Sequence, residues 1–457
     1  MKLPLTPPPL TEALGRLKAE EIEPLLTRGP LVRGRYLHWD ELRHRTPPQG
    51  MTHETWWVGI KLARRSLSKD LPLRDKHGRP MRAGMPDPVL RALHAVDRQA
   101  AGSVEMDSPI ASGEDRDRYL VSSLIEEAIT SSQLEGAATT REEAKAMLRS
   151  GRAPRDRSER MILNNYRVME HIRTLRDQAL TPALVLELHR IVTADTLDDP
   201  SAAGRLRRSS ETVQVVDAQH TTVLHDPPAA ATLPKRLERL ERLCAFANAE
   251  ESGETFIHPV VRAVLLHFML GYDHPFVDGN GRTARALFYW SMARAGYWLM
   301  EYVSISRLLK QAPGKYSRAY LHTETDDNDT TYFLIHQLDT IERAILALHE
   351  YLAHKAAQQR ATEVLLRHAP RISDRINHRQ VALLSHALRH PGHGYTVESH
   401  RTSHRVTPQT ARTDLQDLAQ LGLLEQRKRG RAFVFFAPPD LHQRIETAAG
   451  RRRGGQG

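Results

Sequence analysis

Apolar residues recur every three or four positions along most of the chain, which is the spacing of helices that bury one face. The clearest stretches cover residues 52–67, 115–135, 158–175, 179–195, 234–249, 258–273 and 282–296. A capping box of Thr140 and Glu143 predicts a new helix after a break near Gly136. The stretch 315–352 predicts helix, polar loop and helix, with Asp329 placed to cap the second helix. This pattern predicts a mainly α fold.

Two segments depart from the helical pattern. Thr212–Val216 and Thr221–His225 are rich in β-branched residues and flank a polar turn, so they predict a β-hairpin. Residues 426–436 place a basic turn between strand-forming residues and predict a second hairpin. The stretch 74–88, which is rich in glycine and proline, is predicted to be a loop.

The C-terminal part has its own order of elements. Residues 377–390 predict an amphipathic helix, 395–407 a short helix and turn, and 408–424 a helix with proline in its first turn. Together with the hairpin that follows, this order resembles the winged helix-turn-helix domains of bacterial transcription regulators.

Positive charge is concentrated in the same region. Residues 371–457 contain fifteen Lys or Arg and seven Asp or Glu, whereas the whole chain has a net charge of +10. Charge alone favours a DNA partner and a solvated basic face equally, but the winged-helix pattern favours DNA. The residues expected to contact DNA are Gln409, Thr410, Arg412 and Thr413 on the second helix and Arg427, Lys428, Arg429 and Arg431 on the wing. Winged helices also serve as plain protein contacts, so that interpretation stays open.

Composition limits the remaining classes of protein. A length of 457 residues is enough for about two to four domains. The single cysteine, Cys244, excludes a disulfide framework within the chain and fits a reducing compartment. The N-terminus has no apolar segment of the signal-peptide type, and no apolar run reaches the roughly eighteen residues of a membrane-spanning helix. We therefore expect a cytoplasmic protein with no membrane partner.

The residues that carry chemistry lie in one stretch, HPFVDGNGRTAR, which begins at residue 274. Gly279, Asn280 and Gly281 form a small-residue turn where the backbone can adopt positive φ and approach a ligand closely. The helix predicted after the turn starts with unpaired N–H groups that attract anions. Arg282 and Arg285 share the first turn of that helix and can bind further phosphate oxygens. The stretch therefore predicts a phosphate site.

Two more side chains of this stretch complete the predicted site. Asp278 can hold a divalent metal, because Mg²⁺ typically uses one or two carboxylates together with substrate phosphates. His274 lies on the far side of the turn, and a free imidazole titrates near neutrality, as a general base requires. One histidine among 24 would by itself be interpreted as a loop cap. Its coincidence with the turn, the carboxylate and the two arginines favours a catalytic site.

The same string is similar to the signature of Fic-domain proteins, and every position of that signature is filled. The resemblance implies a helical core that transfers a nucleotide monophosphate, usually AMP from ATP with Mg²⁺, onto a hydroxyl side chain of a protein target. The implied roles are His274 as the base, Phe276 as a packing anchor, Asp278 as the metal ligand, Gly279, Asn280 and Gly281 as the grip on the α and β phosphates, and Arg282 and Arg285 as the grip on the β and γ phosphates.

The resemblance gives two other segments a role. The hairpin at 212–225 would by itself be an ordinary surface hairpin, but in Fic proteins such a flap covers the active site and pairs with the target by strand addition. Fic proteins restrained in cis carry a helix with Ser or Thr, three residues, Glu and then Gly or Asn, and Ser131 to Gly136 match it.

Ser131 and Glu135 share a helix face, which by itself predicts only a hydrophilic helix end. Given the resemblance, we expect Glu135 to pair with Arg285 and to take the place of the γ-phosphate, so that ATP binds in a pose unsuited to in-line attack. In some relatives the same glutamate aids removal of AMP.

The expected parts are an N-terminal helical extension at 1–110, a helical Fic core with flap and inhibitory helix at 111–355, a helical connector at 356–370, a winged helix-turn-helix at 371–440 and a basic tail at 441–457. The expected activity is protein adenylylation from Mg-ATP, restrained by Glu135. One alternative is a DNA-binding regulator that only senses its nucleotide, although a binder would not need the base His274. Another is a Fic enzyme that removes AMP or uses a different nucleotide. Self-association into a homodimer also stays open.

Overall fold

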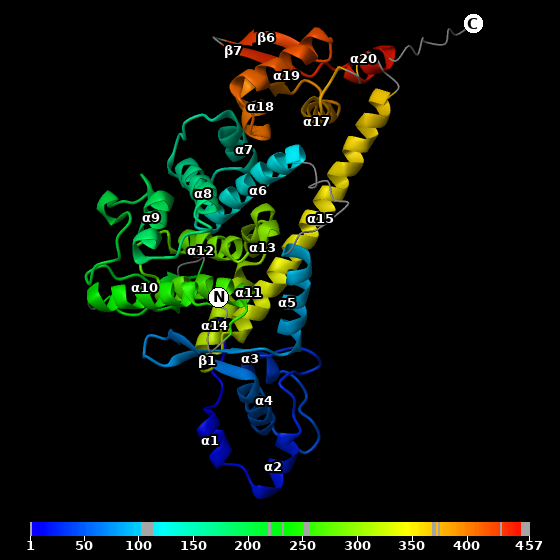
Figure 1. Cartoon of the computed structure of the whole chain (residues 1–457). Coiled ribbons are helices and arrows are strands. Elements are labelled where there is room, and N and C mark those ends of the chain that lie inside the picture. The colour runs from blue at the N-terminus through cyan, green and yellow to red at the C-terminus, as the bar shows by residue number, and fades with distance from the viewer. Residues whose placement is uncertain are drawn as a thin grey trace. The chain divides into compact units, whose positions relative to one another are not determined.

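The computed structural model describes residues 2–101, 113–217, 221–230, 233–250, 256–367, 372, 375–429 and 432–448 (Figure 1). Helices dominate these residues, as the sequence pattern predicts, and the strands form small antiparallel sheets of two or three strands. Among the described helices, none combines the length and the apolar character that a bilayer-spanning segment needs.

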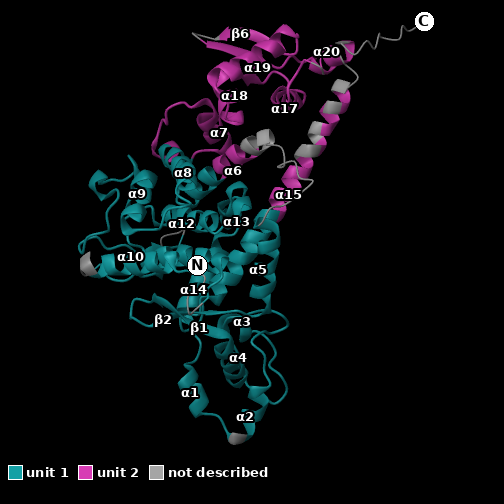
Figure 2. Ribbon diagram, viewed as in Figure 1, with its two compact units in different colours: residues 1–102, 127–138, 160–345 teal, residues 103–126, 139–159, 346–457 magenta. Residues whose placement is uncertain are grey.

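The chain divides into two compact units, which Figure 2 distinguishes by colour. Unit 1 contains residues 1–102, 127–138 and 160–345, and unit 2 contains residues 103–126, 139–159 and 346–457. The helices with residues in both units are α6 (Gly113–Leu134), α8 (Arg157–Thr174) and α15 (Thr331–Arg367).

Unit 1 starts with short helices and a hairpin. These elements are α1 (Leu10–Gly15), α2 (Ala19–Leu26), α3 (Trp39–Leu42), α4 (His53–Leu67), β1 (Ser68–Arg74), β2 (Pro80–Gly84) and α5 (Asp87–Ala100). Because β2 pairs with β1, the loop predicted for residues 74–88 is wrong over the length of β2. Met81 and Ala83 point inward on β2, as Leu71 and Leu73 do on β1. An alternation this short is hard to recognise among so many glycines and prolines.

The rest of unit 1 is a helical core around α11 (Pro259–Asp273). Buried residues cover almost the whole circumference of α11, as a central helix requires. His258 caps this helix through Nδ1, which accepts a hydrogen bond from Val260 N at 3.3 Å. The other helices of the core are α9 (Pro182–Thr193), η2 (Pro200–Ala202), α10 (Leu233–Asn248), α12 (Asn280–Arg294), η3 (Trp298–Tyr302), α13 (Ile305–Gln311) and α14 (Pro313–Thr325).

The predicted central hairpin is present but short. Strands β3 (Val215–Val216) and β4 (Val223–His225) pair antiparallel, and residues 218–220 of the turn lie outside the described residues. Helix α15 begins at Thr331, so Thr330 and not the predicted Asp329 is its N-cap. Asp329 lies one residue earlier, and its Oδ1 accepts a hydrogen bond from Thr331 N at 3.1 Å.

The break after α6 also follows the prediction. The helix ends at Leu134, and Gly136 adopts a positive φ of 92°. Helix α7 (Arg141–Ser150) begins where Thr140 Oγ1 accepts a hydrogen bond from Glu143 N at 3.3 Å. Helix α6 therefore ends in a glycine turn directly after Glu135.

The C-terminal part of unit 2 contains helices around a three-stranded sheet. Its elements are α17 (His378–Ala387), β5 (Gly394–Tyr395), α18 (Val397–His404), α19 (Pro408–Gln420), β6 (Glu425–Arg429), β7 (Ala432–Phe436) and α20 (Leu441–Ala448). The strand order is β5-β7-β6, and the buried core includes Leu384, Leu415, Phe435 and Ile445. The three helices α17, α18 and α19 and the hairpin β6–β7 follow the predicted order, whereas β5 and α20 were not predicted, and α20 lies in the segment expected to be a basic tail. Membership of the winged helix-turn-helix class remains a prediction.

Asp414 on α19 connects three helices of unit 2. Its buried carboxylate accepts hydrogen bonds from Arg379 Nε at 2.7 Å, Asn377 Nδ2 at 2.8 Å and His400 Nε2 at 3.0 Å. Burial opposes the negative charge, but these bonds hold the pKa of Asp414 well below its ordinary value. Its stabilising effect is therefore present above the ordinary pKa of aspartate and is lost as the pH falls through the lowered one.

We expect Asp414→Ala to lower the free energy of unfolding of unit 2 by about 3 kcal/mol, because it leaves Arg379 beside an empty, buried position. Denaturant titration of the full chain, followed by hydrogen exchange of α17 and α19, measures this loss. Asp417→Ala on the same helix is the control and should change the value by less than about 0.5 kcal/mol. Equal losses in the two variants would contradict the role of Asp414.

Candidate active site

The loop between α11 and α12 has a fixed backbone shape. His274 follows α11 in the left-handed conformation, with φ 44° and ψ 56°, and Gly279 precedes α12 with φ 81°. A Cβ at Gly279 would lie 2.6 Å from Thr193 Cγ2. This position therefore needs glycine both for its backbone angle and for its close packing.

His274 is held as a neutral base. Its Nδ1–H donates to Gly271 O at 3.0 Å, since a carbonyl can only accept, and Nε2 keeps its lone pair. Burial lowers the pKa of His274, while the bond to Gly271 and the nearby charge of Glu135 oppose that shift. The imidazole is accordingly unprotonated at neutral pH and can accept a proton at Nε2.

Asn280 braces the loop with both ends of its side chain. Its Oδ1 accepts from Phe276 N at 3.0 Å and its Nδ2 donates to Phe276 O at 2.9 Å, while the Phe276 ring is fully buried. The sequence predicts that Asn280 grips phosphate. Both ends of the side chain therefore take part in holding the loop, and the grip of this residue on phosphate remains a prediction.

Arg282 and Asp278 lie side by side at the start of α12. Arg282 Nη2 is 3.4 Å from Asp278 Oδ1, and Nη1 donates to Val192 O at 3.1 Å. The Arg282 side chain is fully buried, yet its Nε has no hydrogen-bond partner among the described residues. An unpaired buried donor is costly, so this atom points to an anionic ligand that completes the site.

The donor set fits Mg²⁺ only together with a nucleotide. Within the described ranges, no group of three or more His, Cys, Asp or Glu side chains is arranged to hold a metal ion. Asp278 has a partly exposed carboxylate, and Mg²⁺ is commonly held by one such group plus phosphate oxygens and water. Asp278 is therefore a suitable ligand for a Mg²⁺ ion that arrives with ATP.

Glu135 lies against the first turn of α12. Its Oε1 is 2.7 Å from Arg285 Nη2, and a Cβ at Gly281 would lie 2.7 Å from the Glu135 carboxyl carbon. Ser131 adds two bonds to Arg285, from Arg285 Nε to Ser131 Oγ at 2.8 Å and from Arg285 Nη2 to Ser131 O at 3.1 Å. The carboxylate therefore occupies the helix start that would otherwise attract a phosphate.

Glu127 fixes helix α6, whose end leads directly into Glu135. This buried carboxylate accepts hydrogen bonds from Tyr289 Oη at 3.0 Å, Ser304 Oγ at 2.8 Å and Ser306 N at 3.1 Å. Sequence reasoning missed Glu127, because its partners follow it by more than 160 residues and leave no local pattern.

His189 was also missed, and it supports the loop from α9. Gly204 N donates to its Nδ1 at 3.0 Å, so Nε2 carries the proton and donates to Asp278 O at 2.9 Å. The ring stacks on Phe276 with centroids 3.7 Å apart. Burial lowers the pKa of His189 to about 4. In the sequence this residue is a lone histidine on an apolar helix, which gives no functional signal.

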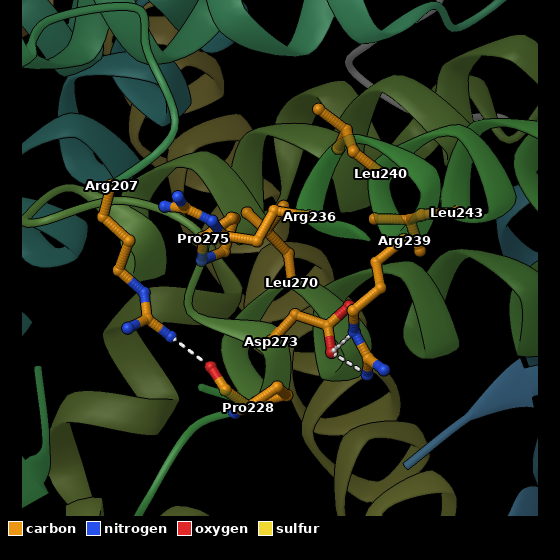
Figure 3. Close-up of a pocket in the computed structure, with 9 residues that line it drawn as sticks. All are labelled: Arg207, Pro228, Arg236, Arg239, Leu240, Leu243, Leu270, Asp273 and Pro275. Atoms are coloured by element: carbon orange, nitrogen blue, oxygen red, sulfur yellow. Dashed lines mark hydrogen bonds and ion pairs between the residues drawn. The ribbon is translucent and has the colours of Figure 1, made fainter. Parts of the chain in front are cut away.

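Arg207 supports the start of the loop. Its Nε donates to His274 O at 2.8 Å, its Nη2 to Pro228 O at 2.6 Å, and its backbone N to Pro275 O at 2.9 Å. Figure 3 shows Arg207 reaching Pro228 beside a cavity of about 20 Å³, where Arg239 pairs with Asp273. This cavity has room for about one water molecule and cannot hold a nucleotide.

The residues predicted to contact DNA lie in unit 2. Gln409, Arg412 and Thr413 are exposed on α19, and Thr410 is partly exposed. On β6, Arg427 and Lys428 are exposed; Arg431 and the side chain of Arg429 lie outside the described residues.

Comparison with known proteins gives one family and several relatives. Residues 179–292 match the Fic/DOC family, a segment that contains the whole loop from His274 to Arg285 but neither Ser131 nor Glu135.

The proteins named "Protein adenylyltransferase Fic" from Drosophila sechellia and Drosophila melanogaster are each 41% identical over 113 residues, which is 25% of this chain and 20% of theirs. The chain thus matches only about a fifth of the length of these relatives. The crystal structure of a Fic family protein from Desulfovibrio desulfuricans G20 is similar with a TM-score of 0.48 and 17% identity, over 78% of this chain and 97% of that one.

The neutral state of His189 predicts a specific loss of stability in acid. Because its pKa is about 4 in the folded chain and about 6.5 when unfolded, stability should fall by up to about 3 kcal/mol as the pH drops from roughly 6.5 towards 4. Denaturant titrations at several pH values measure this slope. His189→Gln should abolish the His189 contribution to this fall in stability with pH. Replacement of the exposed His94 by Gln is the control and should leave the fall unchanged. An unchanged slope in His189→Gln would contradict the bond pattern.

Proposed function

We propose, from the Fic/DOC domain that the chain contains at residues 179–292, that this protein is an adenylyltransferase that moves AMP from Mg-ATP onto a hydroxyl side chain of a protein target. The observation that carries the proposal is a neutral base on the loop and a buried arginine with an unpaired donor in the first turn of α12. His274 keeps Nε2 free for a proton, and Arg282 Nε lacks a partner among the described residues where a phosphate would supply one.

The side chains and amides of the loop and of the first turn of α12 would carry out the proposed reaction. His274 Nε2 removes the proton from the target hydroxyl, whose oxygen attacks the α-phosphorus of ATP. The bond between the α-phosphorus and its bridging oxygen breaks, pyrophosphate leaves, and AMP stays on the target. Asp278 would hold Mg²⁺, which supplies positive charge to the phosphate oxygens when bound. The amides of Gly279, Asn280 and Gly281 and the guanidinium of Arg282 would bind the phosphates.

Glu135 would restrain this reaction. It pairs with Arg285 and lies against Gly281, so its carboxylate competes with the terminal phosphate for the same cation and the same helix start. Ser131 adds to the restraint because it helps to fix the Arg285 side chain.

Transfer of label from ATP tagged on its α-phosphate tests the activity. With Mg²⁺, we expect Glu135→Gly to label itself or lysate proteins at least about tenfold faster than the parent chain, because one competing charged group is removed. Glu135→Gly combined with His274→Ala should lose the label, since the base is gone. If neither Glu135→Gly nor the parent transfers label from any of the four nucleotides while ATP still binds, the transferase proposal fails. Loss of AMP from a labelled target would instead support the reverse direction.

The pH dependence tests the base. The pKa of His274 lies below its ordinary value. The rate of labelling by Glu135→Gly should therefore increase as the pH is raised from acid, and the pH at which it reaches half of its maximum should lie below about 6.5. Loss of the Glu135 charge moves the midpoint further down, since that charge favours the protonated imidazole. A midpoint at or above about 6.5 would contradict a buried base.

A second candidate function is DNA binding by unit 2. It is supported by the exposed polar and basic side chains of Gln409, Arg412 and Thr413 on α19 and of Arg427 and Lys428 on β6. A DNA-binding regulator that merely senses its nucleotide would bind DNA and ATP but would not transfer label.

Binding of the full chain to mixed-sequence duplex DNA at several salt concentrations measures this function. Arg412→Ala together with Lys428→Ala should weaken binding and reduce the slope of log affinity against log salt by about 1 to 2. Lys315→Ala, an exposed cation of unit 1, is the control and should leave the slope unchanged. Equal slopes in the parent, the double variant and the control would show that Arg412 and Lys428 do not contact DNA phosphates.

A further inference from the structure

The end of α6 lies antiparallel to α12, and polar contacts between them recur once per helical turn. The contacting residues are four positions apart on each side, so those on one helix share a face. Each step of four residues forward along α6 is matched by a step of four residues back along α12. All of these residues belong to unit 1. The successive contacts are Glu127 with Tyr289, Ser131 with Arg285, and Glu135, in the turn that ends α6, with Gly281 and Arg285.

Glu127 makes the first of these contacts and has four hydrogen-bond donors. Its Oε2 accepts from Tyr289 Oη at 3.0 Å, Ser304 Oγ at 2.8 Å and Ser306 N at 3.1 Å, and its Oε1 accepts from Ser306 Oγ. The carboxylate and the Tyr289 ring are both buried. Glu127 therefore links α6 to α12 and also to the start of α13.

These bonds fit one axial position of α6. The buried Ala128 and Ile129 pack through apolar contacts, which are non-directional and tolerate a slide of the helix along its axis. A buried carboxylate does not tolerate it, because a shift of one helical turn, about 5.4 Å, would separate it from its four donors and leave it unpaired. Glu127 is thus the side chain that defines the register of α6 against α12.

The register of α6 decides where Glu135 lies. Glu135 Oε1 is 2.7 Å from Arg285 Nη2, and the Glu135 carboxyl carbon is 2.7 Å from the place of a Cβ at Gly281. A glycine at 281 is therefore needed for this approach, and a slide of α6 would end both contacts. The bonds of Glu127 hold the carboxylate of Glu135 in place from two turns away.

We propose that Glu127 is a positioning residue that sets the register of α6 and so keeps Glu135 at the first turn of α12. Its effect on nucleotide binding rests on the proposed function, in which Glu135 and the terminal phosphate of ATP compete for Arg285. Glu127 acts on this competition only through Glu135.

Three variants separate the bonds of Glu127 from its charge. Glu127→Ala removes all four bonds. Glu127→Gln loses the charge but can keep the bonds, since its Oε1 can accept from Tyr289, Ser304 and the Ser306 amide while its Nε2 donates to the Ser306 hydroxyl. Tyr289→Phe keeps the buried ring and deletes only the hydroxyl that joins Glu127 to α12.

A fourth variant controls for loss of stability alone. Leu42 is fully buried in a separate core cluster with Trp39, Trp57 and Ile60. Leu42→Ala opens a cavity in unit 1 without touching α6 or α12, so it destabilises the unit and should leave the nucleotide affinities unchanged.

Calorimetric binding of Mg-ATP and of AMP to the full chain tests the proposal. Glu127→Ala should strengthen ATP binding about fivefold and Tyr289→Phe about twofold to threefold, because Glu135 no longer holds its place against the terminal phosphate. Glu127→Gln should stay within about twofold of the parent chain, since its bonds persist. AMP lacks the competing phosphates, and its affinity should change by less than about twofold in every variant.

A double variant shows whether Glu127 acts through Glu135. In the Glu135→Gln background, adding Glu127→Ala or Tyr289→Phe should change ATP affinity by less than about twofold, because the group that they position is already disabled. A merely structural role of Glu127 would give no gain in affinity and no such dependence on Glu135.

Several results would overturn the proposal. These are ATP affinities of Glu127→Ala and Tyr289→Phe equal to that of the parent, a gain in Glu127→Gln as large as in Glu127→Ala, or the same gain with and without Glu135→Gln. No gain in Glu135→Gln would reject the competition and the proposal with it. If Glu127→Ala does not fold, Tyr289→Phe decides by the same criteria. The measurement needs no turnover, so absence of transferred label would reject the transferase activity and leave the role of Glu127 to be decided by binding.

Discussion

The ion pair between Glu135 and Arg285 is the contact on which the state of the whole site depends. The two residues are 150 positions apart, and their 2.7 Å contact brings the end of α6 against the start of α12. Arg285 is almost completely buried, so leaving it without an anion would be costly. In this structure Glu135 supplies the negative charge that pairs with Arg285. Under the proposed function, a terminal phosphate of ATP would compete with Glu135 for this cation.

The loop that carries His274 is held from several sides, which explains how one short turn can keep so many groups in place. Asn280 braces it internally, His189 supports it from α9, and Arg207 holds its first carbonyls. His225 adds a contact one step upstream, at Tyr272 O. Each of these side chains bonds a backbone atom, so the loop geometry does not depend on flexible side-chain pairs. Such support is what a proton transfer at a fixed distance requires.

The sequence predicts much of the fold because its signals are local. Apolar spacing identifies the helices from α8 to α12, and Gly136 and Thr140 mark a helix end and a cap that the structure confirms. The hairpin β1–β2 was not predicted, because its alternation of apolar and polar residues is short and is interrupted by proline and glycine. His189, Arg207 and Glu127 could not be predicted, since their bonds to Asp278 O, His274 O and Tyr289 Oη each span at least 67 residues. The contact of Glu135 with Arg285 is equally distant and was expected only through the resemblance to Fic proteins.

The most direct test of the account is calorimetric binding of AMP and of ATP to the full chain and to Glu135→Gln. Competition between Glu135 and the terminal phosphate predicts that the substitution strengthens ATP binding about tenfold or more, because a charge-assisted contact is freed for the ligand. AMP lacks the phosphates that would reach Arg285, so its affinity should change by less than about twofold. An equal gain for both nucleotides, or no gain for ATP, would contradict the competition on which the account rests.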